Sequence, residues 1–202
     1  MSTATKTRKL IGTSMLAAVS VVLMFLSFPV PLMPSFIKMD LAELPALIGA
    51  FAYGPLAGAA VCLVKNLISL MKSSSGGVGT LCNFLLGVCF VVPAGLIYKY
   101  NRTRRGALIG ALAGAAIMAV LSIFVNYYVV YPIYTAFMPM EAIIGMYQAI
   151  NPKVQTLWQA LIWFNCPFTF VKGLISVAIC FLIYKPLSPF LKGTNAPQKQ
   201  AA

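Results

Sequence analysis

Polar side chains recur at helical spacing along an apolar segment near the carboxyl terminus. At steps of four, three and four residues the segment carries Asn165, Thr169, Lys172 and Ser176. This spacing places them on one face of a helix. Amides, hydroxyls and ammonium groups are costly in an apolar helix unless they meet partners or line a cavity. The face therefore predicts a site that binds a solute by hydrogen bonds.

The sequence lacks the residues that build most catalytic and metal sites. It has no histidine, three acidic residues, and five cysteines without a C-x-x-C pair. Hydrolytic nucleophiles need a nearby base, and zinc sites need clusters of cysteine and histidine. No G-x-x-x-x-G-K-[ST] phosphate loop is present either. We therefore expect no metal, no resident cofactor and no enzymatic activity, and we interpret the cysteines as small buried apolar residues.

Polar residues from other segments are predicted to meet this face in the outer half of a membrane. Lys65, on the predicted third helix, is expected to lie outside the group. A pocket of amides, hydroxyls, one lysine and aromatic rings suits a neutral, flat, hydrogen-bonding solute better than an ion. The predicted contributors from other segments are Asp40, Glu43, Gly79, Asn83 and Asn126.

The composition indicates that lipid surrounds the helices that position these groups. Of the 202 residues, 60% are hydrophobic and 9% are charged, with a mean hydropathy of +0.90. A water-facing surface cannot be built from such a chain, and its long apolar runs favour helices over a barrel. The net charge of +12 is scattered at the ends of apolar runs, which favours a role in membrane topology over nucleic-acid binding.

We predict an all-α integral membrane protein with six transmembrane helices. The expected helices are 10–28, 41–53, 56–71, 80–98, 107–127 and 167–184, the second and third forming a hairpin at Gly54-Pro55. Residues 1–192 form one transmembrane domain, and the polar tail 193–202 is expected to be disordered and cytoplasmic. A single tilted helix over 41–71 is the alternative to the hairpin, but it would place the basic loop 99–105 on the wrong side.

The distribution of basic residues predicts that both termini are cytoplasmic. Three lysines, Lys38, Lys72 and Lys153, then lie outside. Ten basic residues lie inside, in accord with the positive-inside rule; they are Lys6, Arg8, Lys9, Lys99, Arg102, Arg104, Arg105, Lys185, Lys192 and Lys199.

The segment 128–166 is longer than an ordinary connection and rich in aromatic residues. Two interpretations remain open for it. It is either an interfacial aromatic belt or a lid over the pocket with short helices at 140–150 and 155–164. On the first helix, small residues at four-residue spacing permit either ordinary internal packing or close docking of a partner helix; they are Thr13, Ser14, Ala17 and Ala18.

Several ordered blocks between residues 14 and 184 carry a family resemblance. They include the segments 36–46, 53–58, 64–66, 79–84 and 93–99, followed by Asn126-Tyr127, Pro132-x-Tyr134 and 167–173. With these blocks the sequence resembles the riboflavin-specific substrate-binding (S) components of energy-coupling factor (ECF) vitamin transporters, the RibU family. The resemblance implies riboflavin as the transported ligand, a first loop that acts as a gate, and a bacterial cell membrane location.

The resemblance also implies partners and site residues. The partners are a transmembrane coupling protein, docked at Ser14, Ala17 and Ala18, and two cytoplasmic ATPases. Asn126 and Lys172 fall on positions that the family uses against the vitamin. Together with the polar groups described above, the full set of predicted riboflavin contacts is Asn126, Lys172, Thr169, Asp40, Asn83, Gly79, Met39 and Tyr134.

Two positions depart from the family pattern. Thr169 stands where an asparagine is usual, and Thr80 where an acidic residue or glutamine is common. A hydroxyl replaces only part of the hydrogen bonding of an amide. An S component of the same architecture for another vitamin or flavin therefore remains an alternative. A membrane-embedded enzyme, a further alternative, would need catalytic groups that this composition does not provide.

Overall fold

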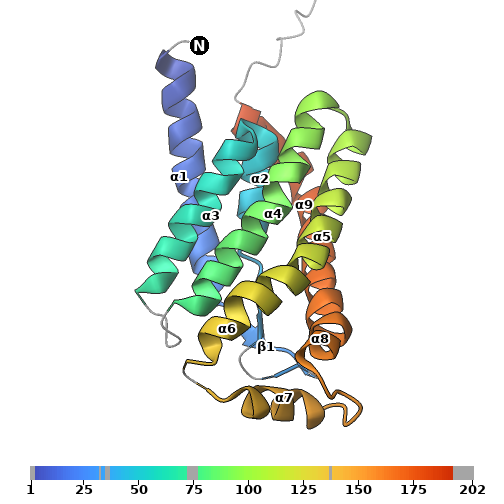
Figure 1. The fold of residues 1–202 in the computed structure, drawn as a ribbon. Coiled ribbons are helices and arrows are strands. Elements are labelled where there is room, and N and C mark those ends of the chain that lie inside the picture. Colours follow the sequence, from blue (N-terminus) through green and yellow to red (C-terminus); the bar gives the residue numbers. More distant parts are fainter. Residues whose placement is uncertain (1–2, 32, 35–36, 72–76, 137, 193–202) are drawn as a thin grey trace, which may run out of the picture.

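Long helices run side by side through most of the protein in the computed structural model (Figure 1). It describes residues 3–31, 33–34, 37–71, 77–136 and 138–192, with side chains as far as residue 183. The predicted tail 193–202 lies outside the described residues, as do Lys72 and the start of the glycine-rich run before Gly77.

Four helical segments of the described chain are long and apolar enough to cross a membrane. They are Thr3–Phe25, Val78–Tyr100, Arg104–Tyr134 and Leu157–Ile183. The first and second of these are α1 (Thr3–Phe25) and α4 (Val78–Tyr100). Two shorter apolar helices, α2 (Glu43–Tyr53) and α3 (Pro55–Leu70), lie between them. The predicted all-α membrane fold is confirmed, while the number of six crossings stays a prediction.

The turn between α2 and α3 lies at Gly54, as predicted. Gly54 has φ +100°, a conformation that residues with a Cβ rarely adopt. Pro55 then begins α3, where its missing N–H costs no helical hydrogen bond. The two helices double back on each other, since the Cα of Gly58 on α3 lies beside the carbonyl oxygen of Ala46 and the Cβ of Ala50 on α2. The interpretation of this stretch as a single tilted helix is therefore wrong.

The first helix spans Thr3–Phe25 instead of the predicted 10–28, because residues Phe28–Pro29 already form a short strand. Two other helices are longer than predicted because each passes through a π-helical turn. α5 (Arg104–Val125) continues through η1 (Asn126–Val130) into α6 (Tyr131–Tyr134). α8 (Leu157–Ala160) continues through η2 (Leu161–Asn165) into α9 (Cys166–Lys192). The predictions that the fifth helix ends at Tyr127 and that the last begins at Pro167 are therefore wrong.

Each π-helical turn comes just before a proline, Pro132 in one helix and Pro167 in the other. A proline ring clashes with the carbonyl group four residues earlier and cannot donate a backbone hydrogen bond. The wider π-helical turn accommodates this clash, so the helix continues where the sequence predicts a break. The short helix predicted at 155–164 is consequently part of a longer one, while that predicted at 140–150 is confirmed as α7 (Met140–Gln148).

The main apolar core lies between α2, α3, α4, α5 and α9, with one side of α1 packed on it. Small residues bring α5 close to α4 on one side and to α9 on the other, as where Gly114 lies beside Phe90 and Gly173 beside Ala115. Buried members of the core include Leu47, Val61, Cys62, Phe90, Val91, Ala94, Ala111, Ala115, Val177 and Cys180. Of the five cysteines predicted to be buried, Cys62, Cys82 and Cys180 are buried, whereas Cys89 and Cys166 are only half-buried, so the prediction is wrong for these two. We call the end of the bundle that carries α7 the α7 end (Figure 1).

Candidate functional site

A cavity of about 510 Å³ is lined by residues of several helices. The parts of the helices that carry these residues lie toward the α7 end (Figure 1). The cavity wall is formed by the end of α1, the connection between α1 and α2, and parts of α3, α4, α5, α6 and α9 with their π-helical turns. Every predicted ligand residue except Met39 lines this cavity. These residues are Asp40, Gly79, Asn83, Asn126, Tyr134, Thr169 and Lys172.

The position of Met39 follows from the extended chain before α2. A short antiparallel ladder joins β1 (Phe28–Pro29) to β2 (Lys38–Met39) and so fixes the α1–α2 connection beside the cavity. Side chains alternate along extended chain, so Lys38 and Asp40 line the cavity while Met39 between them is buried elsewhere. Met39 therefore helps to anchor the connection and does not belong to the cavity wall.

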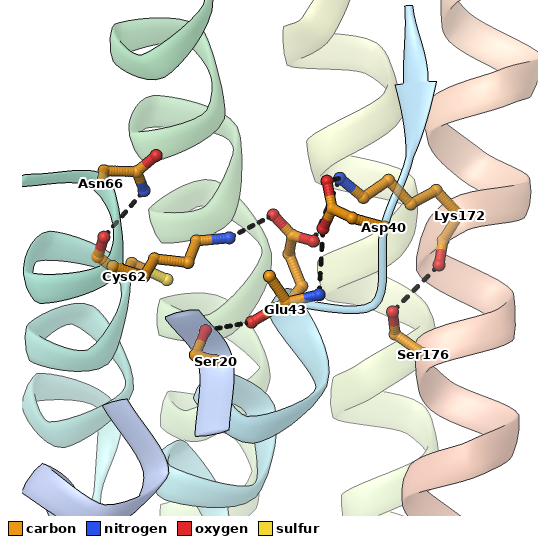
Figure 2. Close-up of polar contacts among 9 residues, drawn as sticks. Ser20, Asp40, Glu43, Cys62, Asn66, Lys172 and Ser176 are labelled. Atoms are coloured by element: carbon orange, nitrogen blue, oxygen red, sulfur yellow. Dashed lines mark hydrogen bonds and ion pairs between the residues drawn. The ribbon is translucent and has the colours of Figure 1, made fainter. Parts of the chain in front are cut away.

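Four buried charged side chains form a continuous network, three of them at the cavity wall and Lys65 behind Glu43 (Figure 2). The Nζ atom of Lys172 lies 3.0 Å from Oδ2 of Asp40 and 3.1 Å from Oε2 of Glu43. The Nζ atom of Lys65 lies 2.7 Å from Oε1 of the same Glu43. Two ammonium groups thus face two carboxylates, and the charges of the network cancel. Buried charges require such pairing, because their desolvation is otherwise very costly.

Lys65 does not line the cavity, in accord with its predicted separation from the pocket residues, but its ammonium pairs with Glu43, which the sequence did not indicate. The long side chain of Lys65 reaches from α3 to Glu43 at the start of α2, so its charge joins the network. Reach along a four-carbon side chain cannot be read from helix position alone.

Hydrogen bonds fix the end of the α1–α2 connection locally and join it to α1. Oδ1 of Asp40 accepts from the backbone N–H of Ala42 at 2.9 Å. The hydroxyl of Ser20 on α1 donates to the carbonyl oxygen of Ala42 at 2.5 Å, as Figure 2 shows. Burial raises the pKa of the Asp40 carboxyl above its ordinary value, and the neighbouring Lys172 ammonium opposes that rise.

Replacing Lys65 by methionine is expected to destabilise the protein. Glu43 would keep one cationic partner instead of two, in a position where it is 3% exposed. Removing one member of a buried charge network costs about 3–5 kcal/mol. We expect a lower unfolding temperature in detergent. The double variant Lys65→Met/Glu43→Gln, which removes both charges, should recover part of the loss, and no recovery would contradict the pairing.

Two buried asparagines place amide groups at the cavity wall, one at each π-helical turn. Asn126 begins η1; its Nδ2 donates to the carbonyl oxygen of Ser122 at 2.7 Å, and its Oδ1 accepts from the thiol of Cys82 at 3.7 Å. Asn165 ends η2, and its Oδ1 accepts from the hydroxyl of Tyr147 at 2.7 Å. π-Helical turns often occur at functional sites.

Some cavity residues were not among the predicted ligand contacts. Glu43 and Asn165 were expected near the pocket from their spacing but not as contacts. For Tyr131 and Phe168, the sequence gives no indication of a place in the cavity wall other than their position in aromatic-rich segments. These four residues and the apolar Ile37, Leu86 and Met118 complete much of the wall.

The cavity has the groups needed to hold a polar, flat solute. It combines carboxylates, an ammonium, amides and hydroxyls with aromatic and aliphatic side chains. Within the described ranges, no group of three or more histidine, cysteine, aspartate or glutamate residues could hold a metal ion. Such a wall suits hydrogen bonding along the edge of a ring system and apolar contact with its faces.

The small residues of α1 fall on two different sides of the helix. Ala17 is 3% exposed and packs in the core beside Leu16. Ser14 and Ala18 are exposed, and they lie one turn apart on the outer side. Of the two interpretations given for this stretch, internal packing therefore holds for Ala17, whereas Ser14 and Ala18 leave a face available for another helix.

Comparisons with known proteins agree with one another. The profile of the family described as "ECF transporter, substrate-specific component" matches residues 8–184. The chain is 33% identical to the riboflavin transporter FmnP of Bacillus subtilis, over 93% of this chain and 95% of that protein. It is 32% identical to the riboflavin transporter RibU of Staphylococcus aureus, over 92% and 93% respectively.

A solved structure described as the S component of a bacterial ECF transporter has a similar fold. It superposes with a TM-score of 0.73 at 32% identity, and the match covers 93% of this chain and 99% of that one. The relatives named above are transporters and not enzymes.

Proposed function

Because the chain belongs to the family of ECF transporter substrate-specific components, we propose that it is the membrane subunit that binds riboflavin for uptake by an ECF module. The observation that carries the proposal is the cavity at the α7 end, where the predicted ligand residues other than Met39 come together. Relatives named as riboflavin transporters share about a third of the sequence over most of its length.

The cavity offers distinct partners to the two parts of riboflavin. The isoalloxazine ring is flat and has polar atoms along one edge, which amides such as Asn126 can meet by hydrogen bonds. The hydroxyl-bearing ribityl chain can exchange hydrogen bonds with charged and hydroxyl groups, among them Asp40, Thr169 and Lys172. Asn83, Gly79 and Tyr134 complete the wall around the ligand in this proposal. Riboflavin is the transported ligand, and no resident cofactor is proposed.

Transport requires energy that this chain does not itself supply. We propose that the outer face of α1, with Ser14 and Ala18, docks on a transmembrane coupling protein that is joined to two cytoplasmic ATPases. Small side chains allow two helices in a membrane to approach closely, which supports this assignment. Ala17, on the inner side of α1, packs in the apolar core and so holds this helix against the rest of the protein.

The protein is a multi-pass membrane protein, and we propose that it lies in a bacterial cell membrane with both termini in the cytoplasm. The excess of lysine and arginine in the segments 6–9 and 99–105 supports this orientation. The cavity at the α7 end would then open to the outside and receive the vitamin there.

A fluorescence titration tests the proposed ligand. Detergent-purified protein, stripped of bound flavin, should quench riboflavin fluorescence saturably with one site per chain. Aromatic side chains around a flavin ring favour such quenching, because they contact its faces. Absence of riboflavin binding, together with saturable binding of another vitamin, would keep the architecture and replace the substrate by that vitamin. A related flavin that binds more tightly than riboflavin would change the proposed ligand in the same way.

A further inference from the structure

Tyr147 is buried next to the cavity wall but does not line the cavity. It lies on α7, where Ile143 and Tyr147, one turn apart, are 2% and 0% exposed. Its ring packs against that of Phe164, with centroids 5.5 Å apart. The other residues of α7 are half-buried or exposed. α7 therefore places the hydroxyl group of Tyr147 inside the protein, next to the ligand cavity.

The hydroxyl of Tyr147 is the middle of a short hydrogen-bonded chain. Its oxygen lies 2.6 Å from the hydroxyl oxygen of Tyr131, and it donates to Oδ1 of Asn165 at 2.7 Å. Because the proton of Tyr147 goes to Asn165, its oxygen accepts the proton of Tyr131. Tyr131 and Asn165 both line the cavity. This series of hydrogen bonds thus joins α6, α7 and the end of η2 next to the site.

These hydrogen bonds determine whether the oxygen or the NH2 group of the Asn165 amide is left for a ligand. The oxygen of the amide is occupied by Tyr147, and the NH2 group of a planar amide points to a different side. Turning the amide over would reverse both hydrogen bonds. The proton of Tyr131, in a side chain that is 2% exposed, would then lose Tyr147 as its acceptor, and a buried donor without a partner is costly.

We propose that Tyr147 is a positioning residue that holds the Asn165 amide with its NH2 group toward the cavity. The site then selects a ligand with a hydrogen-bond acceptor, such as a ring carbonyl oxygen, at this point. The inference rests on the proposed function, because the ligand is taken to be riboflavin, but it concerns a residue outside the cavity wall.

Replacing Tyr147 by phenylalanine tests the proposal with little change in shape. The ring contact with Phe164 remains, whereas the hydroxyl that orients Asn165 is lost. We expect riboflavin binding in detergent to weaken about tenfold, as for one lost hydrogen bond with a neighbouring group left unpaired. The matched control is Tyr128→Phe, at a tyrosine that is 68% exposed, and its affinity should equal that of the wild type.

A double-variant cycle separates positioning from a general loss of packing. Asn165→Ala alone should weaken binding, and adding Tyr147→Phe to it should weaken binding no further, because the amide to be oriented is gone. Additive effects of the two substitutions would overturn the proposal. The same holds for an unchanged affinity of Tyr147→Phe.

Two further measurements separate this inference from a general loss of structure at Asn165 and from a wrong choice of ligand. Asn165→Asp keeps an acceptor for Tyr147 but removes the donor group, so it should bind riboflavin more weakly than the wild type; equal affinity would overturn the proposal. If the wild type itself does not bind riboflavin, the proposed function fails. If it binds and Tyr147→Phe binds equally well, only the present inference fails.

Discussion

Riboflavin binding is expected to weaken about a hundredfold when Lys172 is replaced by methionine. The ammonium of Lys172 lies at the cavity wall within 3.0 Å and 3.1 Å of carboxylate oxygens on Asp40 and Glu43. A hydrogen bond to a charged group contributes up to about 3 kcal/mol, which is roughly a hundredfold in affinity. The substitution also removes the ion pair that joins Asp40, in the α1–α2 connection, to α9. Fluorescence titration of the purified variant measures the change.

Loss of binding must be separated from loss of folding. Lys172→Met leaves Asp40 without its cation, whereas Lys172→Met/Asp40→Asn leaves only the neutral pair of Lys65 and Glu43. The double variant should unfold at a higher temperature than the single one and should still bind weakly. Lys153→Met, at an exposed lysine, is the matched control and should bind as the wild type does. Affinity within about twofold of the wild type in Lys172→Met would rule out the proposed role; that threshold corresponds to about 0.4 kcal/mol.

Uptake, but not binding, is expected to be lost when Ala18 is replaced by tryptophan. Ala18 is exposed on the outer side of α1 and does not line the cavity. A tryptophan there would prevent a partner helix from approaching closely, and because Ala18 is exposed within the described part of the chain, the ring can point away from the core. Riboflavin affinity in detergent should stay at the wild-type value. Uptake by cells that also produce the ECF module should fall to background.

Two other alanines provide the controls for this substitution. Ala116→Trp places the same side chain on an exposed position of α5, and uptake should persist there. Ala17→Trp puts the ring into the core at a residue that is 3% exposed, so we expect that variant to misfold. Normal uptake in Ala18→Trp, or equal loss in Ala116→Trp, would contradict docking through this face of α1.

Periodicity and turn chemistry predicted most of the helices and the location of the site. Lys172, Thr169 and Asn165 follow one face of an apolar helix, and in the structure all three line the cavity. The hairpin at Gly54-Pro55 follows from a glycine and a proline in sequence, and both occupy the expected positions. These features are local, so a single sequence is sufficient to predict them.

The incorrect or missing predictions arise where the tertiary structure overrides a local rule. Pro132 and Pro167 predict helix ends, but a π-helical turn before each proline lets the helix continue. The position of Lys65 on α3 does not indicate that its ammonium forms an ion pair with Glu43 on α2. The chain from Tyr131 through Tyr147 to Asn165 joins three helical segments, and neither spacing nor composition indicates such a junction.

The cancellation of charge in the buried network has a consequence for the response to membrane voltage. Moving one uncompensated elementary charge through a potential of 100 mV changes the free energy by about 2.3 kcal/mol. Asp40, Glu43, Lys65 and Lys172 move as a neutral group if the site changes its depth in the membrane, and riboflavin adds no charge to them. The electrical potential then neither drives nor opposes the movement of the buried site, so in the proposed transport cycle the work would have to come from the ATPases of the ECF module.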